Sequence, residues 1–239
     1  EIVGLSEVGE HGEFTETALE EYSEPYLTLA TFGKIISVSR KLLIQDKLNA
    51  LGDMAGKLGR SAREHENKSL VAKLVENSGS GPTMADENPL FHAAHGNLAA
   101  TGAALSEETL SDGRLAMRRQ TDPFGERIEA VPTHLLVPPE LETIAEKTLS
   151  AVAAARTSDV NVFSNGLTLV VDSRLVDANA WYLIAAATPG LHYAHLEGSA
   201  QPEIRTEVGF NIDGTRHRVR LDFGCGFVDW RGWYRNAGA

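Results

Sequence analysis

The second half of the chain alternates apolar and polar positions in a way that predicts a long β-strand over residues 216–230. Val219, Leu221 and Phe223 recur at every second position, and Cys225 and Phe227 continue the same side. Successive side chains of a strand point to opposite faces, so this spacing is typical of a strand with one buried face. Arginines at positions 216, 218 and 220 occupy the other face. That face is therefore predicted either to be solvated or to meet acidic groups of a neighbouring molecule.

Shorter apolar runs predict the remaining strands of this half. They cover residues 135–137, 167–171, 181–186, 191–196 and 203–212. Asp213 and Gly214 separate the last run from the long strand. An Asp-Gly pair between two strands favours a tight hairpin.

Residues 26–44 are rich in β-branched and aromatic side chains and predict a two-stranded ribbon. Apolar residues alternate on both sides of Phe32, Gly33 and Lys34, where the hairpin tip is expected. An isolated hairpin is only marginally stable in water. The ribbon is therefore expected to need a partner surface, for example on another copy of the chain.

Helical spacing of apolar residues predicts a long helix, continuous or broken, over residues 46–77. If continuous, it would extend ~48 Å. Gly52, Gly56 and Gly59 lie on nearly one of its faces. Each glycine costs ~1 kcal/mol relative to alanine inside a helix, which makes sense if another backbone approaches that face closely.

Two further helices are predicted from their end signals. Ser106 is a suitable cap for a helix over residues 106–120, which has glutamates in its first turn and arginines in its last. Pro138 and Pro139 open the third helix, whose apolar stripe includes Ile144 and Ala145.

Composition narrows the function classes. The chain has 239 residues, a formal net charge of −11 and one cysteine. Proteins that bind polyanions generally need clustered Lys and Arg, so the net negative charge argues against a general polyanion-binding protein. A negative charge would instead suit a container for DNA, whose acidic inner face would keep the DNA from adhering. A single cysteine allows no intrachain disulfide and fits a protein made in a reducing cytosol. No apolar run approaches the ~20 residues that span a bilayer.

Residues 1–24 are rich in glutamate and show little apolar periodicity. Such a segment has little reason to order alone, and we interpret it as an extended arm. Either the arm gains structure by lying on a neighbouring molecule, or it is a plain unattached terminus.

Candidate chemistry is sparse. His92 and His95 lie three residues apart and could share a metal on one helical turn, but no HExxH pattern or nearby carboxylate completes the set. The alternative is a turn whose imidazoles hydrogen-bond the backbone. Cys225 is expected to be a small buried hydrophobe. No G-x-S-x-G, P-loop or G-x-G-x-x-G motif occurs, so no catalytic, cofactor-binding or metal-binding residue is predicted.

Lys34, at the predicted ribbon tip, supports one covalent hypothesis. A lysine held in a dry pocket beside an Asn amide and a carboxylate can form an isopeptide bond once its amine has lost its proton. Asn211, near the other predicted hairpin, is a conceivable acceptor. The alternative is an ordinary surface lysine.

Three stretches resemble the major head subunit family of Mu-like phages. They are FGKIISVSRKLLIQD at 32–46, LFHAAHGNL at 90–98 and HLLVPPELE at 134–142, and the tail from 223 to 236 is similar as well. Together they run in order from about residue 26 to the end of the chain.

This resemblance implies the α+β shell fold of tailed-phage (Hong Kong-type) capsid proteins. The implied parts are an N-terminal arm (1–25), an extended ribbon loop (26–45), a peripheral domain with a spine helix (46–90), an axial domain (91–200) and return strands of both domains (201–239).

The resemblance also implies a function: a major capsid protein whose copies form the hexamers and pentamers of an icosahedral phage head. The head would enclose double-stranded DNA without binding it specifically, and it would assemble in the cytoplasm of the bacterial host. The resemblance implies portal, decoration and processing-protease partners, and a processing protease is consistent with glutamate as residue 1. It implies no enzyme activity, no cofactor and no membrane partner. The rivals are a related shell (a gene-transfer particle or a protein-filled nanocompartment) and a metal-dependent hydrolase using His92 and His95.

Overall fold

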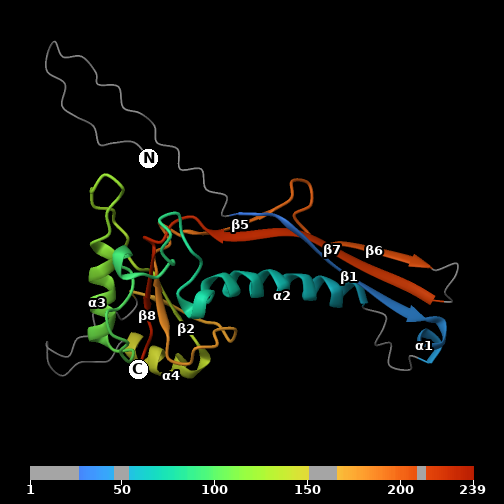
Figure 1. Cartoon of the computed structure of the whole chain (residues 1–239). Helices are drawn as coiled ribbons and strands as arrows, with labels where there is room; N and C mark the ends of the chain where they lie inside the picture. The colour runs from blue at the N-terminus through green and yellow to red at the C-terminus, as the bar shows by residue number, and fades with distance from the viewer. Residues whose placement is uncertain (1–26, 46–53, 151–165, 209–213) are drawn as a thin grey trace, which may run out of the picture.

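The computed structural model describes residues 27–45, 54–150, 166–208 and 214–239, which form a compact body and a long ribbon with a helix beside it (Figure 1). In chain order the elements are β1 (Ala30–Ser39), α1 (Arg40–Gln45), α2 (Met54–Leu74), η1 (Asn77–Gly79), η2 (Ala93–His95), α3 (Glu107–Arg118), β2 (His134–Val137), η3 (Pro139–Leu141), α4 (Glu142–Leu149), β3 (Thr168–Val171), β4 (Trp181–Ile184), β5 (Leu191–His195), β6 (Glu203–Val208), β7 (Gly214–Phe227) and β8 (Trp233–Asn236). The predicted α+β class is confirmed by this mixture.

The ribbon consists of β1, β5, β6 and β7. β1 pairs antiparallel with one edge of β7 over its whole length, from Ala30 opposite Phe223 to Ser39 opposite Gly214. β5 and β6 pair antiparallel with the other edge of β7. α2 lies along one face of the ribbon (Figure 1), where Leu58 and Ala62 pack on the alternating apolar residues of β7.

The compact body is built on a four-stranded sheet with strand order β3-β2-β4-β8. β2 and β3 are parallel, and the other two pairs are antiparallel. Trp181 and Leu183 of β4 are fully buried in one cluster with Leu110 of α3. A second cluster contains Phe227 of β7 and Leu74 of α2, so the ribbon and α2 are both anchored at one end in the body.

The predicted helices agree with the structure wherever it describes them. α2 confirms the long helix from Met54 to Leu74, three residues short of the predicted end, and residues 46–53 lie outside the described residues. α3 begins after Ser106, whose side chain and that of Thr109 accept each other's backbone N–H in a capping box. In the third helix Ala145 is buried as predicted, but Ile144 is 46% exposed. None of the described helices is long and apolar enough to cross a membrane.

The hairpin tip expected at Phe32, Gly33 and Lys34 is wrong. These residues lie in the middle of β1, a single strand whose partner is β7, with Gly33 opposite Arg220. A Cβ at Gly33 would lie 3.0 Å from the carbonyl oxygen of Val219, so the glycine allows close approach of two strands and makes no turn. The predicted hairpin near Gly214 is confirmed by the antiparallel pairing of β6 with β7; Asp213 lies outside the described residues.

Candidate functional site

The ribbon has two unlike faces, because side chains of its paired strands alternate in register. On the inner face, toward α2, Val219, Leu221 and Phe223 form a cluster with Leu58 and Ala62. The ribbon was expected to need a partner surface, for example on another copy of the chain; on this face the partner surface is α2 of the same chain.

The outer face carries the predicted row of arginines. Arg220 is matched within the chain, since its Nε lies 3.6 Å from Glu203 and 3.4 Å from Asp222. Arg218 lies directly opposite Arg205 of β6, and like charges in directly opposed positions destabilise a sheet. On the β1 side, Arg218 faces Ile35, which is 61% exposed. Arg205 itself pairs with Glu203 at 2.5 Å, and Arg216 lies opposite Glu207. Arg218 therefore has no acidic residue directly opposite it, and it adjoins an exposed apolar side chain.

Ile35 and Arg205 are the residues of this face that sequence reasoning missed. Both lie in strands whose partners are distant in sequence, and only the register with β7 brings them beside Arg218. The alternation within each strand gave the face of each residue but not its neighbours.

Polar contacts fix α2 to the rest of the chain. Arg174 donates hydrogen bonds from Nε and Nη2 to Glu64 at 3.2 and 2.8 Å, and this contact lowers the pKa of Glu64. The His195 ring nitrogen Nε2 lies 2.9 Å from Glu66 Oε1. α2 is thereby tied to the loop after β3 and to the end of β5.

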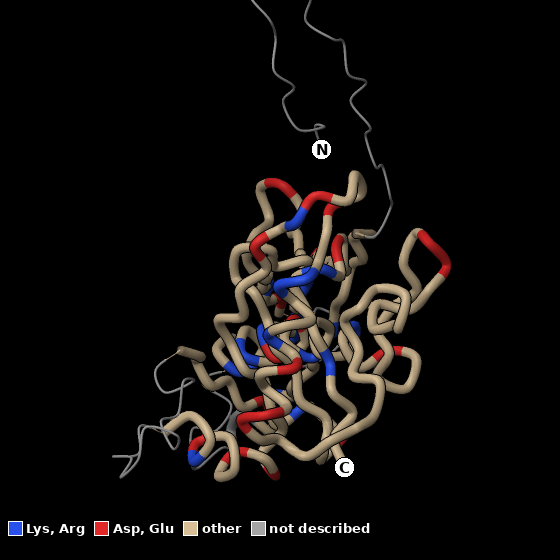
Figure 2. Tube along the Cα trace, turned by 90° about the vertical axis from the view of Figure 1, so that its left-hand side faces the viewer, with Lys and Arg blue, Asp and Glu red and all other residues tan. Residues whose placement is uncertain are grey.

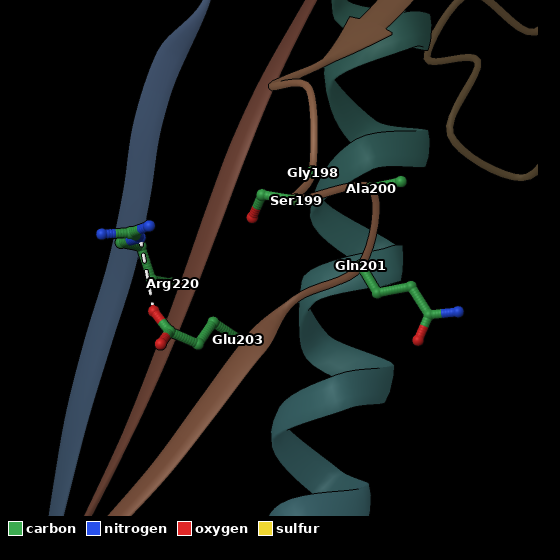
Figure 3. Close-up of a pocket in the computed structure, with 6 residues that line it drawn as sticks. All are labelled: Gly198, Ser199, Ala200, Gln201, Glu203 and Arg220. Carbon is green, nitrogen blue, oxygen red and sulfur yellow. Dashed lines mark ion pairs between the residues drawn. The ribbon is translucent and has the colours of Figure 1, made fainter.

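Two hollows flank the β5–β6 loop (residues 196–202). The first, about 620 Å³, lies beside Glu203 and Arg220. Figure 3 shows Gln201 pointing away from that ion pair. The second is a crevice of about 740 Å³ between α2 and the loop, lined by Gly56, Gly59, Arg60, Arg63, Glu66, Asn67, Leu70, Tyr193, His195, Ala200, Gln201, Pro202, Ile204 and Phe223. We call this second hollow the α2 crevice.

His92 and His95 do not form a metal pair. His95 is buried, with Nδ1 3.0 Å from the carbonyl oxygen of Leu90 and Nε2 2.7 Å from Asp86 Oδ2. A neutral imidazole can donate only one of these two hydrogen bonds, and the protonated ring donates both. Trp230 stacks on the same ring at 4.2 Å. With both nitrogens engaged, His95 acts as a clasp for the Asp86 loop.

The carboxylate that the sequence analysis did not connect with this histidine is Asp86, nine residues away. The predicted alternative, in which the imidazoles hydrogen-bond the backbone, holds for both rings, since His92 Nδ1 accepts from the N–H of Ala94. Across the described ranges no three His, Cys, Asp or Glu side chains come together in a way that could hold a metal ion. The hydrolase alternative therefore has no support in the geometry.

The proposed crosslink stays a prediction. Lys34 is exposed on β1, opposite Val219, so the described residues form no dry pocket around it. Asn211 lies outside the described residues. Cys225, expected to be buried, is partly buried, and burial raises the pKa of its thiol.

Seen along the long direction of the molecule, the charged residues that the structure describes do not gather into a broad basic face. In Figure 2, Asp and Glu mark many of the projecting loops, and Lys and Arg fall mostly toward the middle of the view. On β7 the arginines form a narrow row, which suits a contact with a small acidic surface better than the binding of a nucleic-acid duplex.

Comparisons with known proteins agree with this architecture. The capsid of an empty gene-transfer-agent particle has a TM-score of 0.59 at 12% identity, covering 98% of this chain and 80% of that one. The Gordonia phage Cozz structure gives 0.55 at 11% identity, with 98% and 77% covered. The SrpI encapsulin complex of Synechococcus elongatus PCC 7942 gives 0.51 at 13%, with 87% and 73% covered. These likenesses show the Hong Kong-type capsid fold.

A comparison with curated proteins gave no match. A family model described as phage capsid protein matches residues 23–236, which is nearly the whole chain. The chain therefore belongs to the phage capsid protein family.

Proposed function

We propose that this chain is the major capsid protein of a tailed phage of the Mu-like kind. Its copies assemble into the hexamers and pentamers of an icosahedral head that encloses double-stranded DNA. The observation that carries the proposal is the outer face of the ribbon, where Ile35 is 61% exposed beside the opposed Arg205 and Arg218. An exposed apolar residue beside an arginine with no acidic residue directly opposite it is typical of a contact surface completed by another molecule.

The shape of the molecule supports the same proposal. The ribbon and α2 extend away from the compact body (Figure 1), so one copy reaches across its neighbours and buries area that a compact subunit would not offer. Many copies of one modest contact then add up to a stable shell. The glutamate-rich residues 1–25 act as a second reaching element, the arm.

The remaining parts of the proposal concern partners and place. The shell holds its DNA without specific contacts, in keeping with the net charge of −11. Assembly takes place in the cytoplasm of the bacterial host, with a portal, decoration proteins and a processing protease as partners. The subunit itself has a structural role and no catalytic one.

A pair of surface variants tests the contact. Ile35→Ser combined with Arg218→Glu changes only exposed side chains of the ribbon, so the subunit should fold and fail to form particles. Val176→Ser removes an even more exposed apolar side chain, 89% exposed, from a loop of the compact body, and this control should assemble. Electron microscopy and sedimentation velocity of the expressed proteins measure both. Normal icosahedral shells from the ribbon variant would end this account of the face.

A second candidate is a related shell with another cargo, because the structural neighbours include a gene-transfer-agent capsid and an encapsulin. Cargo separates the possibilities. Particles purified from the native source should contain phage genomic DNA; random host DNA fragments would indicate a gene-transfer particle, and a protein cargo a nanocompartment.

A further inference from the structure

Residues 82–90 form a small hairpin, here called the strap, which is closed at its neck by its own backbone. The N–H of Leu90 donates to the carbonyl oxygen of Pro82 at 2.8 Å. Nearer the tip, the N–H of Met84 donates to the carbonyl oxygen of Asn88, also at 2.8 Å. Because these hydrogen bonds lie within the hairpin, the strap can keep its shape when its tip leaves the body.

Two side chains hold the tip of the strap against the body. Met84 is 4% exposed and lies in the cluster that also contains Leu74 of α2 and Phe227 of β7. Asp86 Oδ2 lies 2.7 Å from Nε2 of His95. In the part of the chain that the structure describes, this contact is the only hydrogen bond that joins a strap side chain to another segment. One buried thioether and one ion pair therefore keep the strap closed.

The His95 half of this clasp is fixed in the body. Its ring stacks on Trp230 at 4.2 Å, and Gln120 Nε2 donates to its backbone carbonyl oxygen at 2.8 Å. Its Nδ1 lies 3.0 Å from the carbonyl oxygen of Leu90, at the neck of the strap. One ring nitrogen thus holds the neck and the other holds the tip, so the contact with Asp86 is where the strap can open.

The charges around the clasp leave Asp86 paired with His95. The ring of His92 is centred 6.0 Å from the ring of His95. Arg231 lies over the tryptophan that stacks on His95, and it is paired with Asp229 at 3.2 Å. Among the described residues no other ion pair reaches Asp86. A change in the charge of this carboxylate therefore acts on the clasp.

Acid weakens the clasp. Burial raises the pKa of Asp86, while hydrogen bonds from Asn88 and His95 lower it, and the net shift is downward. A carboxylate with a lowered pKa stabilises the closed strap above the ordinary aspartate value, and this contribution is lost as the pH falls through the folded-state pKa. Once protonated, the carboxyl group has no charge with which to strengthen its hydrogen bond to the ring.

We propose that the strap is a pH-sensitive closure over the joint between the ribbon and the body, with Asp86 and His95 as its clasp. In acid the tip swings away from the body and Met84 leaves the cluster. Because Leu74 and Phe227 anchor α2 and β7 in the same cluster, opening the strap loosens the joint. This inference rests on the fold alone, so it holds whatever the shell contains.

Oxidation of methionine measures the opening of the strap. Hydrogen peroxide adds an oxygen atom to an exposed thioether, and peptide mass spectrometry separates Met84 from Met117, which is buried in the core of the body. In full-length subunits before assembly, both should react slowly near neutral pH. As the pH falls through the folded-state pKa of Asp86, the rate at Met84 should rise severalfold relative to the rate at Met117.

A matched pair of variants isolates the clasp. Asp86→Asn removes the charge and keeps the shape of the side chain, so Met84 should already react severalfold faster near neutral pH and should lose its dependence on acid. Asp122→Asn removes a carboxylate that accepts from two backbone N–H groups of its own loop. This control should behave as the parent does.

Three results would overturn the inference. The first is a constant ratio of the Met84 and Met117 rates across the acid range, and the second is an Asp86→Asn variant that protects Met84 as well as the parent does. The third is an acid-induced rise shared equally by Met117, because the body would then unfold as a whole and the strap would have no opening of its own.

Hydrogen exchange tests the effect on the joint. In Asp86→Asn the amides of the last turn of α2 should exchange severalfold faster than in the parent, and those of β2 should be unchanged. Equal exchange in the last turn of α2 would contradict the loosening of the joint.

Discussion

The compact body and the ribbon differ in how completely they pack against their own chain. The sheet β3-β2-β4-β8 and helix α3 share a cluster in which Trp181, Leu183 and Leu110 are fully inaccessible. The ribbon buries a smaller cluster against α2 on one face and leaves Ile35 61% exposed on the other. The body is therefore stabilised by packing within one chain, whereas the ribbon leaves one face open to contacts with other molecules.

The largest expected effect on stability comes from truncating a fully buried side chain in the core of the body. Trp181→Ala removes a side chain that is 0% exposed, and such truncations destabilise by about 3–5 kcal/mol. Urea unfolding of the assembly-incompetent ribbon variant, with and without Trp181→Ala, measures the free energy of unfolding. A loss below about 1 kcal/mol would mean that the body does not carry the stability of the chain.

A matched pair of glycine substitutions sharpens the comparison. A Cβ at Gly113 of α3 would lie 2.8 Å from Leu183 Cδ1 and 2.9 Å from Tyr234 Cε1, so Gly113→Ala should cost about 1–3 kcal/mol by overpacking. The same change at Gly59 of α2 brings a Cβ only to ordinary contact with Ile204 Cδ1, at 3.9 Å, and should stabilise the helix by up to about 1 kcal/mol. Thermal unfolding of the two variants should therefore move in opposite directions. A shift of the same sign would show that α2 and α3 are equally enclosed.

A smaller, pH-dependent effect is expected at the clasp between Asp86 and His95. Burial raises the pKa of Asp86, but hydrogen bonds from Asn88 and His95 outweigh it, so the pKa lies below its usual range. The ionised carboxylate therefore stabilises the fold above the usual aspartate pKa, and this contribution is lost as the pH falls through the folded-state value. The carboxylate is 36% exposed, so solvent screening keeps the effect modest.

Asp86→Asn tests the clasp. Near neutral pH the variant should be less stable than the parent, and the difference should shrink as the pH falls through the folded-state pKa of Asp86. Asp122→Asn, at a carboxylate that accepts only backbone N–H groups of its own turn, controls for a general effect of removing a charge. A stability difference that stays constant over the acid range would contradict the assigned role.

Local signals predicted most elements of the fold, because helix caps and side-chain periodicity are properties of neighbouring residues. Ser106 marked the start of α3, and alternation gave the two faces of β7. The partner of β1 could not be predicted in this way. Ala30 and Phe223 lie at opposite ends of the sequence, and strand periodicity carries no information on which strand is adjacent.

The candidate site was predicted only in part for the same reason. The arginine row follows from the alternation in β7, whereas its exposed neighbour Ile35 and the opposed Arg205 depend on long-range register. Gly59 indicated a close backbone approach, but the structure shows that a Cβ there would meet only Ile204 Cδ1, at 3.9 Å, among the described residues.

Hydrogen exchange of free subunits and of assembled particles tests most directly whether other copies complete the ribbon. In free subunits the amides of β1 and β6 should exchange faster than those of β4 and β8. Assembly should slow exchange in β1 and β6 and leave β4 and β8 unchanged. If β1 and β6 are as protected as β4 and β8 in the free subunit, and assembly changes nothing, the ribbon is complete within one chain and the account is contradicted.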